Sequence, residues 1–400
     1  SATGHLLLDA VNGIGVPAKA IETRVASMSL RNTAAGDVLV NEADALTLSA
    51  IGGGVAEAVV SAGSAGSLVL RAGGAITQDA AISVTGSVGH LGVSTTAGAI
   101  TLNAAVNLSH GSADVSAKSD LNLNGVLTLS GTTASASTVA LLAQTGALVM
   151  GSSAAINTSA GGGSARLKAN GQIKLGQVNV GTGTVEVDSD TASVVVADGY
   201  AGLNVTAAAL RVDAVTGIGA GAAPIKTEVT TLAAQTSSSG GVFVSEATSV
   251  AVGSVAAASV NAVANSGTAV AITAGNSGAA ISGISAGAGA VVLQATAGDL
   301  SLTASTGSVT ATGAGNVLLS ASGALNVNAT VNADSGAVSM LSGGSMAFAA
   351  DGDVSASAGI DAEAGFGAAT SSTLNMNAGT VFNSGNAATR LWADGAIGLG

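Results

Sequence analysis

Residue types that build ordinary globular cores are scarce in this sequence. Its 400 residues include no cysteine, two prolines, one tryptophan, one tyrosine and four phenylalanines. Charged residues make up 8% of the chain, against about 25% in typical globular domains. The lack of cysteine excludes a disulfide framework and zinc–thiolate sites, and the lack of aromatic residues excludes a thick core packed around large rings.

Basic residues and long apolar runs are also few. There are 11 lysines and arginines against 23 acidic residues, which gives a formal net charge of −12. This balance argues against nucleic acid or an anionic membrane as a partner. No apolar run approaches the roughly 18 residues of a membrane-spanning helix, so we expect no membrane insertion of this segment. The first five residues do not resemble a signal peptide, so we expect the export signal to lie upstream.

Small aliphatic residues and glycine are abundant instead. Hydrophobic residues make up 48% of the chain and there are 58 glycines, a composition too apolar for a disordered protein. Short alternating runs such as 75–78, 81–84 and 99–102 have the period of two that is typical of strands with one buried face. We find no sustained helical period, so we expect almost no helix.

The strand-like runs recur at a regular distance. Ile76, Ile100 and Leu121 begin equivalent runs that are 24 and 21 residues apart. Each period of about 22 to 24 residues contains three such runs, separated by Gly, Ala, Ser or Asn. We therefore predict an all-β, three-sided parallel β-helix in which these three side chains stack inside the core, while glycines form the corners.

The sequence also contains a second repeat that is much longer than this period. Residues 8–15 reappear as 212–219, an offset of 204, and the match continues to Glu42 and Glu246. Residues 391–400 align with 6–15, an offset of 385. The predicted structural residues of the two module openings are Asp9, Gly13, Gly15, Asp213, Gly217 and Gly219. We predict one continuous rod with a first module over 1–204 of about nine coils, a second over 205–385 of about eight, and the truncated start of a third over 386–400.

These segments suggest a family. The run Gly98–Leu108, together with the Asp-x-x-x-Gly-Ile-Gly openings, resembles the repeat regions of filamentous-haemagglutinin-like adhesins, giant surface proteins of Gram-negative bacteria. The resemblance implies a right-handed β-helical shaft at the extracellular bacterial surface, exported with an outer-membrane secretion partner. It also implies roles in adhesion, aggregation or biofilm, with a host or neighbouring cell or like molecules as partners.

Acidic residues gather in two places. Glu186, Asp188 and Asp190 alternate along one predicted strand, and Asp351 and Asp353 lie near Asp361 and Glu363. Alternate carboxylates share one strand face, so calcium binding is the metal hypothesis. The competing interpretation, which we prefer, is a solvated outward face with Val185 and Val187 pointing inward. We therefore predict no cofactor.

Catalysis is the remaining question, because polysaccharide-degrading enzymes also use parallel β-helices. Such sites need clustered carboxylates or bases, usually with aromatic platforms for sugars. Here the bases are dispersed, Tyr200 and Trp392 are far apart in sequence, and His5, His90 and His110 are isolated from one another. We predict that the chain is not an enzyme. It is expected to be the structural shaft of a secreted surface adhesin, with a self-assembling filament, sheath or surface-layer subunit as the alternative and a polysaccharide-active enzyme third.

Overall fold

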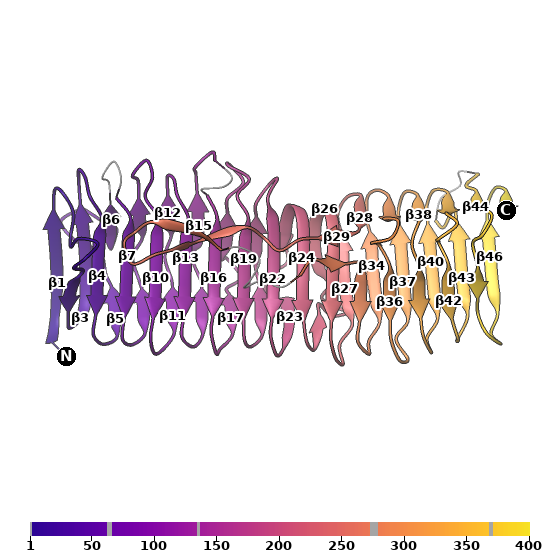
Figure 1. Cartoon of the computed structure of the whole chain (residues 1–400), viewed down its shortest axis with the longest axis horizontal. Helices are drawn as coiled ribbons and strands as arrows, with labels where there is room; N and C mark the ends of the chain where they lie inside the picture. Colours follow the sequence, from indigo (N-terminus) through magenta and orange to yellow (C-terminus); the bar gives the residue numbers. More distant parts are fainter. Residues whose placement is uncertain (1, 62–65, 134–136, 273–278, 368–370) are drawn as a thin grey trace. The chain divides into compact units, whose positions relative to one another are not determined.

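The chain folds as a parallel β-solenoid of about 16 turns (Figure 1). The computed structural model describes residues 2–61, 66–133, 137–272, 279–367 and 371–400. This described part contains no helix, so it has none that is long and apolar enough to cross a membrane. The predicted all-β parallel helix is confirmed at this level.

The solenoid strands fall into three ladders, because most of them pair with the strand three places further along the chain. The turn formed by β7 (Leu68–Ala72), β8 (Ile76–Gln78) and β9 (Ile82–Val84) stacks on β10 (Leu91–Thr95), β11 (Ile100–Leu102) and β12 (Val106–Leu108). The first ladder uses strands of about five residues and the other two use strands of about three. Three strands per turn therefore agree with the sequence period.

Two compact units make up the chain. Unit 1 comprises Ser1–Asp188, Ala197–Ala201 and Ala258–Gly278, and unit 2 comprises Ser189–Val196, Gly202–Ala257 and Ala279–Gly400. In unit 1 the long strands are β1 (Ala2–Ala10) and β3 (Val25–Asn32). Besides β7 and β10, its first-ladder strands are β2 (Ile21–Thr23), β4 (Val38–Glu42), β13 (Ala113–Ala117), β16 (Val139–Ala143), β19 (Ala165–Ala169) and β22 (Thr184–Ser189). Its other two ladders add β5 (Leu46–Leu48), β14 (Leu121–Leu123), β17 (Leu148–Met150) and β20 (Ile173–Leu175), and then β6 (Val59–Ser61), β15 (Val126–Leu129), β18 (Ala155–Asn157) and β21 (Gln177–Asn179).

Unit 2 has the same three ladders. It begins with β23 (Ser193–Val196), β24 (Val205–Ala214), β25 (Gly217–Ile218) and the long β26 (Ile225–Thr236). Its first ladder continues with β27 (Val242–Glu246), β34 (Val291–Ala295), β37 (Val317–Ala321), β40 (Val338–Ser342), β43 (Ile360–Ala364) and β46 (Thr389–Ala393). The second has β28 (Val250–Val252), β35 (Leu300–Leu302), β38 (Leu325–Val327), β41 (Met346–Phe348), β44 (Leu374–Met376) and β47 (Ile397–Leu399). The third has β33 (Ile284–Ala286), β36 (Val309–Ala311), β39 (Val331–Ala333), β42 (Val354–Ala356) and β45 (Phe382–Asn383).

The core is a set of stacked aliphatic rows. Ile100 pairs in register with Ile76 on one side and with Leu121 on the other, as their spacing predicts. All three side chains are buried, whereas Thr101, which points to the opposite face of the strand, is only half-buried. Successive strands in a parallel ladder lie about 4.8 Å apart, so small branched side chains fill each layer.

Glycines form the corners at both module openings. Gly13, Gly15, Gly217 and Gly219 all have positive φ, between 64° and 142°. A Cβ atom on Gly15 would lie 2.6 Å from the carbonyl oxygen of Leu39, and one on Gly219 would lie 2.5 Å from that of Phe243. Neither position can accept a side chain without moving the neighbouring backbone.

The 204-residue sequence match is accompanied by matching strand pairing. Ile21 pairs with Val40 in unit 1, and Ile225 pairs with Val244 in unit 2. At the openings, Asp9 bonds to Arg31 of the next turn, and Asp213 accepts a hydrogen bond from Gln235, also one turn on, at 2.9 Å. At the C-terminal match, equivalent residues lie in different ladders. Leu391 pairs with Ala362 in the first ladder. Leu6 pairs with Met28, and Met28 in turn pairs with β5 of the second ladder. The division into modules 1–204, 205–385 and 386–400 stays a prediction.

One long segment leaves the ladders. After β5, ten residues (49–58) with one antiparallel bridge between Gly52 and Val55 connect to β6. After the equivalent β28, residues 253–283 connect to β33, and we call this segment the arm. Its strands pair antiparallel, β29 (Ser254–Val255) with β32 (Ile281–Ser282) and β30 (Val260–Val263) with β31 (Ala269–Ile272). The arm takes up residues that we had counted as solenoid, so the chain makes about 16 turns rather than the nine and eight expected for the two modules together.

Candidate functional site

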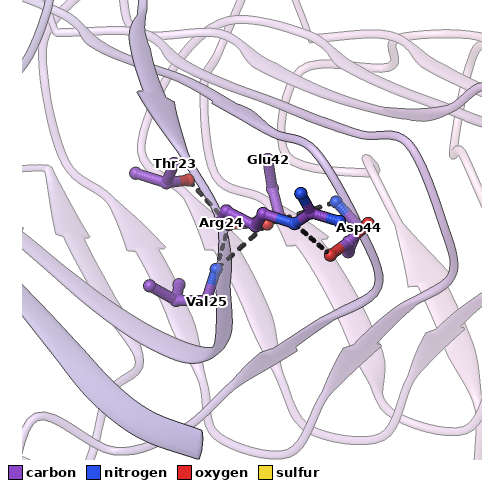
Figure 2. A network of polar contacts seen from close by, with 5 residues as sticks. All are labelled: Thr23, Arg24, Val25, Glu42 and Asp44. Atoms are coloured by element: carbon purple, nitrogen blue, oxygen red, sulfur yellow. Dashed lines mark hydrogen bonds and ion pairs between the residues drawn. The ribbon is translucent and has the colours of Figure 1, made fainter. Parts of the chain in front are cut away.

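A buried glutamate stands at the same corner in both units. In unit 1, Glu42 is 3% exposed and its carboxylate accepts hydrogen bonds from the Thr23 hydroxyl at 2.7 Å and from the Val25 amide at 3.1 Å (Figure 2). The Asp44 amide donates to it at 3.2 Å, and Arg24 covers the corner through an ion pair with Asp44. The carboxylate therefore binds the backbone of two successive turns.

Unit 2 repeats this arrangement with Glu246, which is fully buried. Its carboxylate accepts hydrogen bonds from the Thr227 hydroxyl at 2.7 Å and the Val229 amide at 3.0 Å. The amide and hydroxyl of Thr248 donate to the other oxygen at 3.0 and 2.8 Å. Charge-assisted hydrogen bonds of this kind stabilise a buried carboxylate. Both glutamates therefore have a structural role, which is to link two successive turns, and we call them the glutamate pins.

The arm covers an outward-facing row of unit 1. This row follows the first ladder and consists of Leu39, Val69, Gly92, Asp114, Ala140, Arg166 and Glu186. Val263 of β30 packs against Leu39 and Val69, and Ala258 and Val260 pack against Ala140. In Figure 1 the arm crosses the strands of this ladder, which include β10, β13 and β16. The residues of this row are thereby buried except Asp114, which is half-buried, and Glu186, for which we preferred a solvated face, is among the buried ones.

Hydrogen bonds fix the arm along this row. The Asn261 amide donates to the Thr138 hydroxyl at 2.9 Å, and the Val263 amide donates to the Asp114 carboxylate at 3.0 Å. Further towards the arm's turn, the Ser67 hydroxyl donates to the carbonyl of Gly267 at 2.7 Å. The arm is therefore docked by specific polar contacts as well as by apolar packing.

Asp114 is half-buried beside the arm, and this environment affects the pKa of its carboxyl. Burial beneath the arm raises the pKa of its carboxyl above the usual 3.8, because desolvation disfavours the charged form. The Val263 amide and the positive charge of Arg71 act in the opposite direction and lower this pKa, but burial is the larger effect.

The predicted acidic positions have different surroundings. Val185 and Val187 point into the core as expected, but Glu186 is fully buried rather than solvated, because the Ala258 amide of the arm donates to its carboxylate at 2.8 Å. Arg166 lies 3.5 Å from that carboxylate, and Lys168 lies 2.6 Å from Asp188. Cations rather than further carboxylates therefore face these two acids.

The other acidic candidates are spread out. Asp190 and Asp351 are exposed, and Asp353 accepts a hydrogen bond from the Val381 amide at 2.7 Å. Asp361 and Glu363 both pair with Arg390 at 2.7 Å. Within residues 2–61, 66–133, 137–272, 279–367 and 371–400, no three histidine or acidic side chains are grouped so that they could hold a metal ion.

His5 and His90 have different surroundings. His5 bonds to the hydroxyls of Ser27 and Ser29, whereas His90 Nδ1 accepts a hydrogen bond from the Ser112 amide at 2.9 Å. Burial lowers the pKa of His90 below 6.5, and the nearby Asp37 raises it by less. The neutral ring is thus the form that the fold prefers.

A groove lies where the turn of the arm meets the start of the solenoid. It has a volume of about 460 Å³. Its lining residues are Pro17, Ala18, Lys19, Ala20, Glu22, Leu39, Val40, Asn41, Val69, Arg71 and Asn265. Leu39 and Val69 are apolar, and Lys19, Arg71 and the two asparagines provide hydrogen-bond donors. We did not predict this groove from the sequence, because the arm that completes it was interpreted as solenoid.

Comparison with known protein families, characterised proteins and solved structures finds no match.

Proposed function

We propose that this chain is part of the structural shaft of a large secreted bacterial surface protein, which presents or mediates adhesion between cells without catalysis. The resemblance of its repeats to filamentous-haemagglutinin-like adhesins motivates the proposal. We further propose that the solenoid is right-handed, because connections between parallel strands of one sheet are almost always right-handed. Three strands per turn favour a three-sided cross-section.

The observation that carries this proposal is the unbroken register of the inward rows. Ile76, Ile100 and Leu121 illustrate a pattern that holds over successive turns in both units. Each turn packs mainly on its neighbours, and the backbone hydrogen bonds between turns follow the stacking direction. Such a stack can be lengthened turn by turn and can carry load, which suits a shaft.

Removing whole turns from the parent protein tests this role. Deleting residues 291–337 removes two turns of unit 2. It connects β33 to β40, which belongs to the same ladder as the removed β34, and should leave a shorter stack that still reaches the cell surface. We expect surface exposure to persist while adhesion falls as the distance between the cell and the distal region shrinks. Immunogold electron microscopy on the producing cells shows whether the shortened protein is exposed at the surface, and a cell-attachment assay measures adhesion. Unchanged attachment after removal of the entire 400-residue region would contradict a shaft role.

Self-assembly is the second candidate, and one surface favours it. In unit 2 the outward row that corresponds to Leu39 and Val69 contains Phe243, Val292 and Leu318, which pair in register and are partly exposed. Leu39 and Val69 are covered by the arm, whereas these three apolar side chains retain exposed area, and contiguous apolar surface promotes association. A uniform filament or lattice in electron micrographs, lost on Phe243→Ser, would support assembly over a single standing shaft.

A further inference from the structure

Arg71 has an unusual environment in the groove beside the arm. Its side chain lines this groove and is half-buried, and its Nε atom is shielded from solvent without a hydrogen-bond partner. Among the residues that the structure describes, the Arg71 side chain makes no hydrogen bond and no ion pair. A buried charged donor without an acceptor costs free energy, so the position calls for an anionic partner.

The neighbouring charges do not provide that partner. Asp114 is close enough for Arg71 to lower its pKa, but its carboxylate already accepts a hydrogen bond from the Val263 amide of the arm. Glu22 lines the groove and accepts a hydrogen bond from the Asn41 side chain at 2.8 Å. Lys19, on the tight turn closed by the bridge between Val16 and Lys19, adds a second, exposed cation.

The fold itself does not require these cations. At the matching positions of unit 2, Lys19 is replaced by Ala223 and Arg71 by Gln294. Leu39 is replaced by Phe243, whose ring lies 3.8 Å from where a Cβ on Gly221 would stand, so the ring occupies this region. The same corner therefore folds without Lys19 and Arg71, which are specific to the first copy.

We propose that this groove binds a carboxylate-bearing polyhydroxy acid of about the size of one sugar residue. Arg71 pairs with the carboxylate, because a guanidinium presents two parallel donors to it, and Lys19 adds a second positive charge. The Asn41 and Asn265 side-chain amides bond to hydroxyls of the acid. Since Asn265 belongs to the arm, the site is complete only when the arm is docked. This proposal does not depend on the proposed shaft role, so an experiment can refute either one and leave the other standing.

The test is calorimetric titration of the whole chain with D-glucuronate, with neutral D-glucose as the matched ligand. We expect saturable binding of glucuronate and at least about 10-fold weaker binding of glucose. Arg71→Gln should weaken glucuronate binding by at least about 10-fold and Lys19→Gln by a few fold. Lys118→Gln removes an exposed lysine outside the groove and should leave binding unchanged. Arg71→Lys, which retains charge but loses the paired donors, should give an intermediate affinity.

Several results would overturn the proposal. These are equal binding of glucose and glucuronate, unchanged affinity in a folded Arg71→Gln variant, or tight binding of inorganic sulfate without glucuronate. Circular dichroism checks that each variant is folded. Alginate, a polymer of uronic acids, distinguishes the two sources of the ligand. Binding of alginate alone would identify a polysaccharide, and binding of glucuronate alone would identify the free acid. Binding of neither would refute the site.

Discussion

Two corners that follow matching sequences have very different lengths. In both places a buried glutamate, Glu42 or Glu246, closes the same turn, and a three-residue strand follows. After that strand, unit 1 uses ten residues (49–58) to reach the next strand, whereas unit 2 uses residues 253–283. The ladders on either side keep their pairing. The comparison teaches that register and inward side chains are tightly constrained in this fold, while the length of a corner is not.

The largest effect should come from placing a charge inside a ladder. Ile100→Asp puts a carboxylate among fully buried aliphatic side chains, and we expect a loss of about 4 kcal/mol or more in the free energy of unfolding of the surrounding turns. Thr101→Asp on the same strand points outward and should cost less than about 1 kcal/mol. Urea denaturation of both variants measures the difference. Equal losses would mean that the inward and outward faces are wrongly assigned.

The glutamate pins should come next. Glu246→Gln replaces an acceptor oxygen by an amide group that faces backbone donors, so we expect a loss of about 2 kcal/mol. Glu42→Gln should cost somewhat less, because fewer side-chain donors surround it. The same change at the exposed Glu228 is the control, and thermal unfolding is the measurement. If the Glu228 variant loses as much, the pins have no special role.

A smaller, local effect should follow from loosening the arm. Val263→Ser removes apolar contact with Leu39 and Val69 and should weaken docking by about 1–2 kcal/mol. Hydrogen exchange of residues 258–272 should then accelerate about 10-fold, while the ladders keep their protection. Val270, on the partner strand of the arm, is 56% exposed, and its change to Ser should alter nothing. Global unfolding of the Val263 variant would show that the arm is not separable from the solenoid.

The sequence predicted the ladders but not the arm, for a physical reason. Inward residues such as Ile76, Ile100 and Leu121 must recur once per turn, so their spacing is visible in the sequence. The arm has the same Ala, Val, Ser and Gly composition as the solenoid. From Val242 to its partner Val291 there are 49 residues, which is close to two turns. The 204-residue match was followed only to Glu42 and Glu246, which is short of the point after Val252 where the arm begins.

The candidate site was less accessible to sequence analysis. Lys19 and Arg71 are 52 positions apart, and Asn265 joins them only through the arm. Glu186 was correctly placed on an outward face, but its burial depends on Ala258, which is distant in sequence. The period of the sequence shows which residues point inward. The contacts of the arm depend instead on which turns it packs against, and the period of the sequence does not show this.

The smallest expected effect is a pH dependence of arm docking. Burial raises the pKa of Asp114 when the arm is docked, so the docked state binds the proton more strongly than the undocked state. Lowering the pH from this raised pKa towards 3.8 should therefore strengthen docking. Hydrogen exchange of the arm, corrected for the intrinsic effect of pH, measures it.

Two variants control this last measurement. Asp114→Asn should abolish the dependence. His90 should act in the opposite direction below pH 6.5, because its pKa is lowered by burial and protonation breaks its bond from Ser112, so a His90→Gln background isolates the contribution of Asp114. Docking that weakens on acidification in that background would contradict the assignment.

The glutamate pins bear on how such a stack comes apart. A solenoid that loses turns from one end normally unzips by small, similar increments. Glu42 and Glu246 each tie two successive turns through several charge-assisted bonds, so both turns must yield together at those points. Under a pulling force, the stepwise loss of turns should therefore pause at two points along the chain, the turns that contain Glu42 and Glu246.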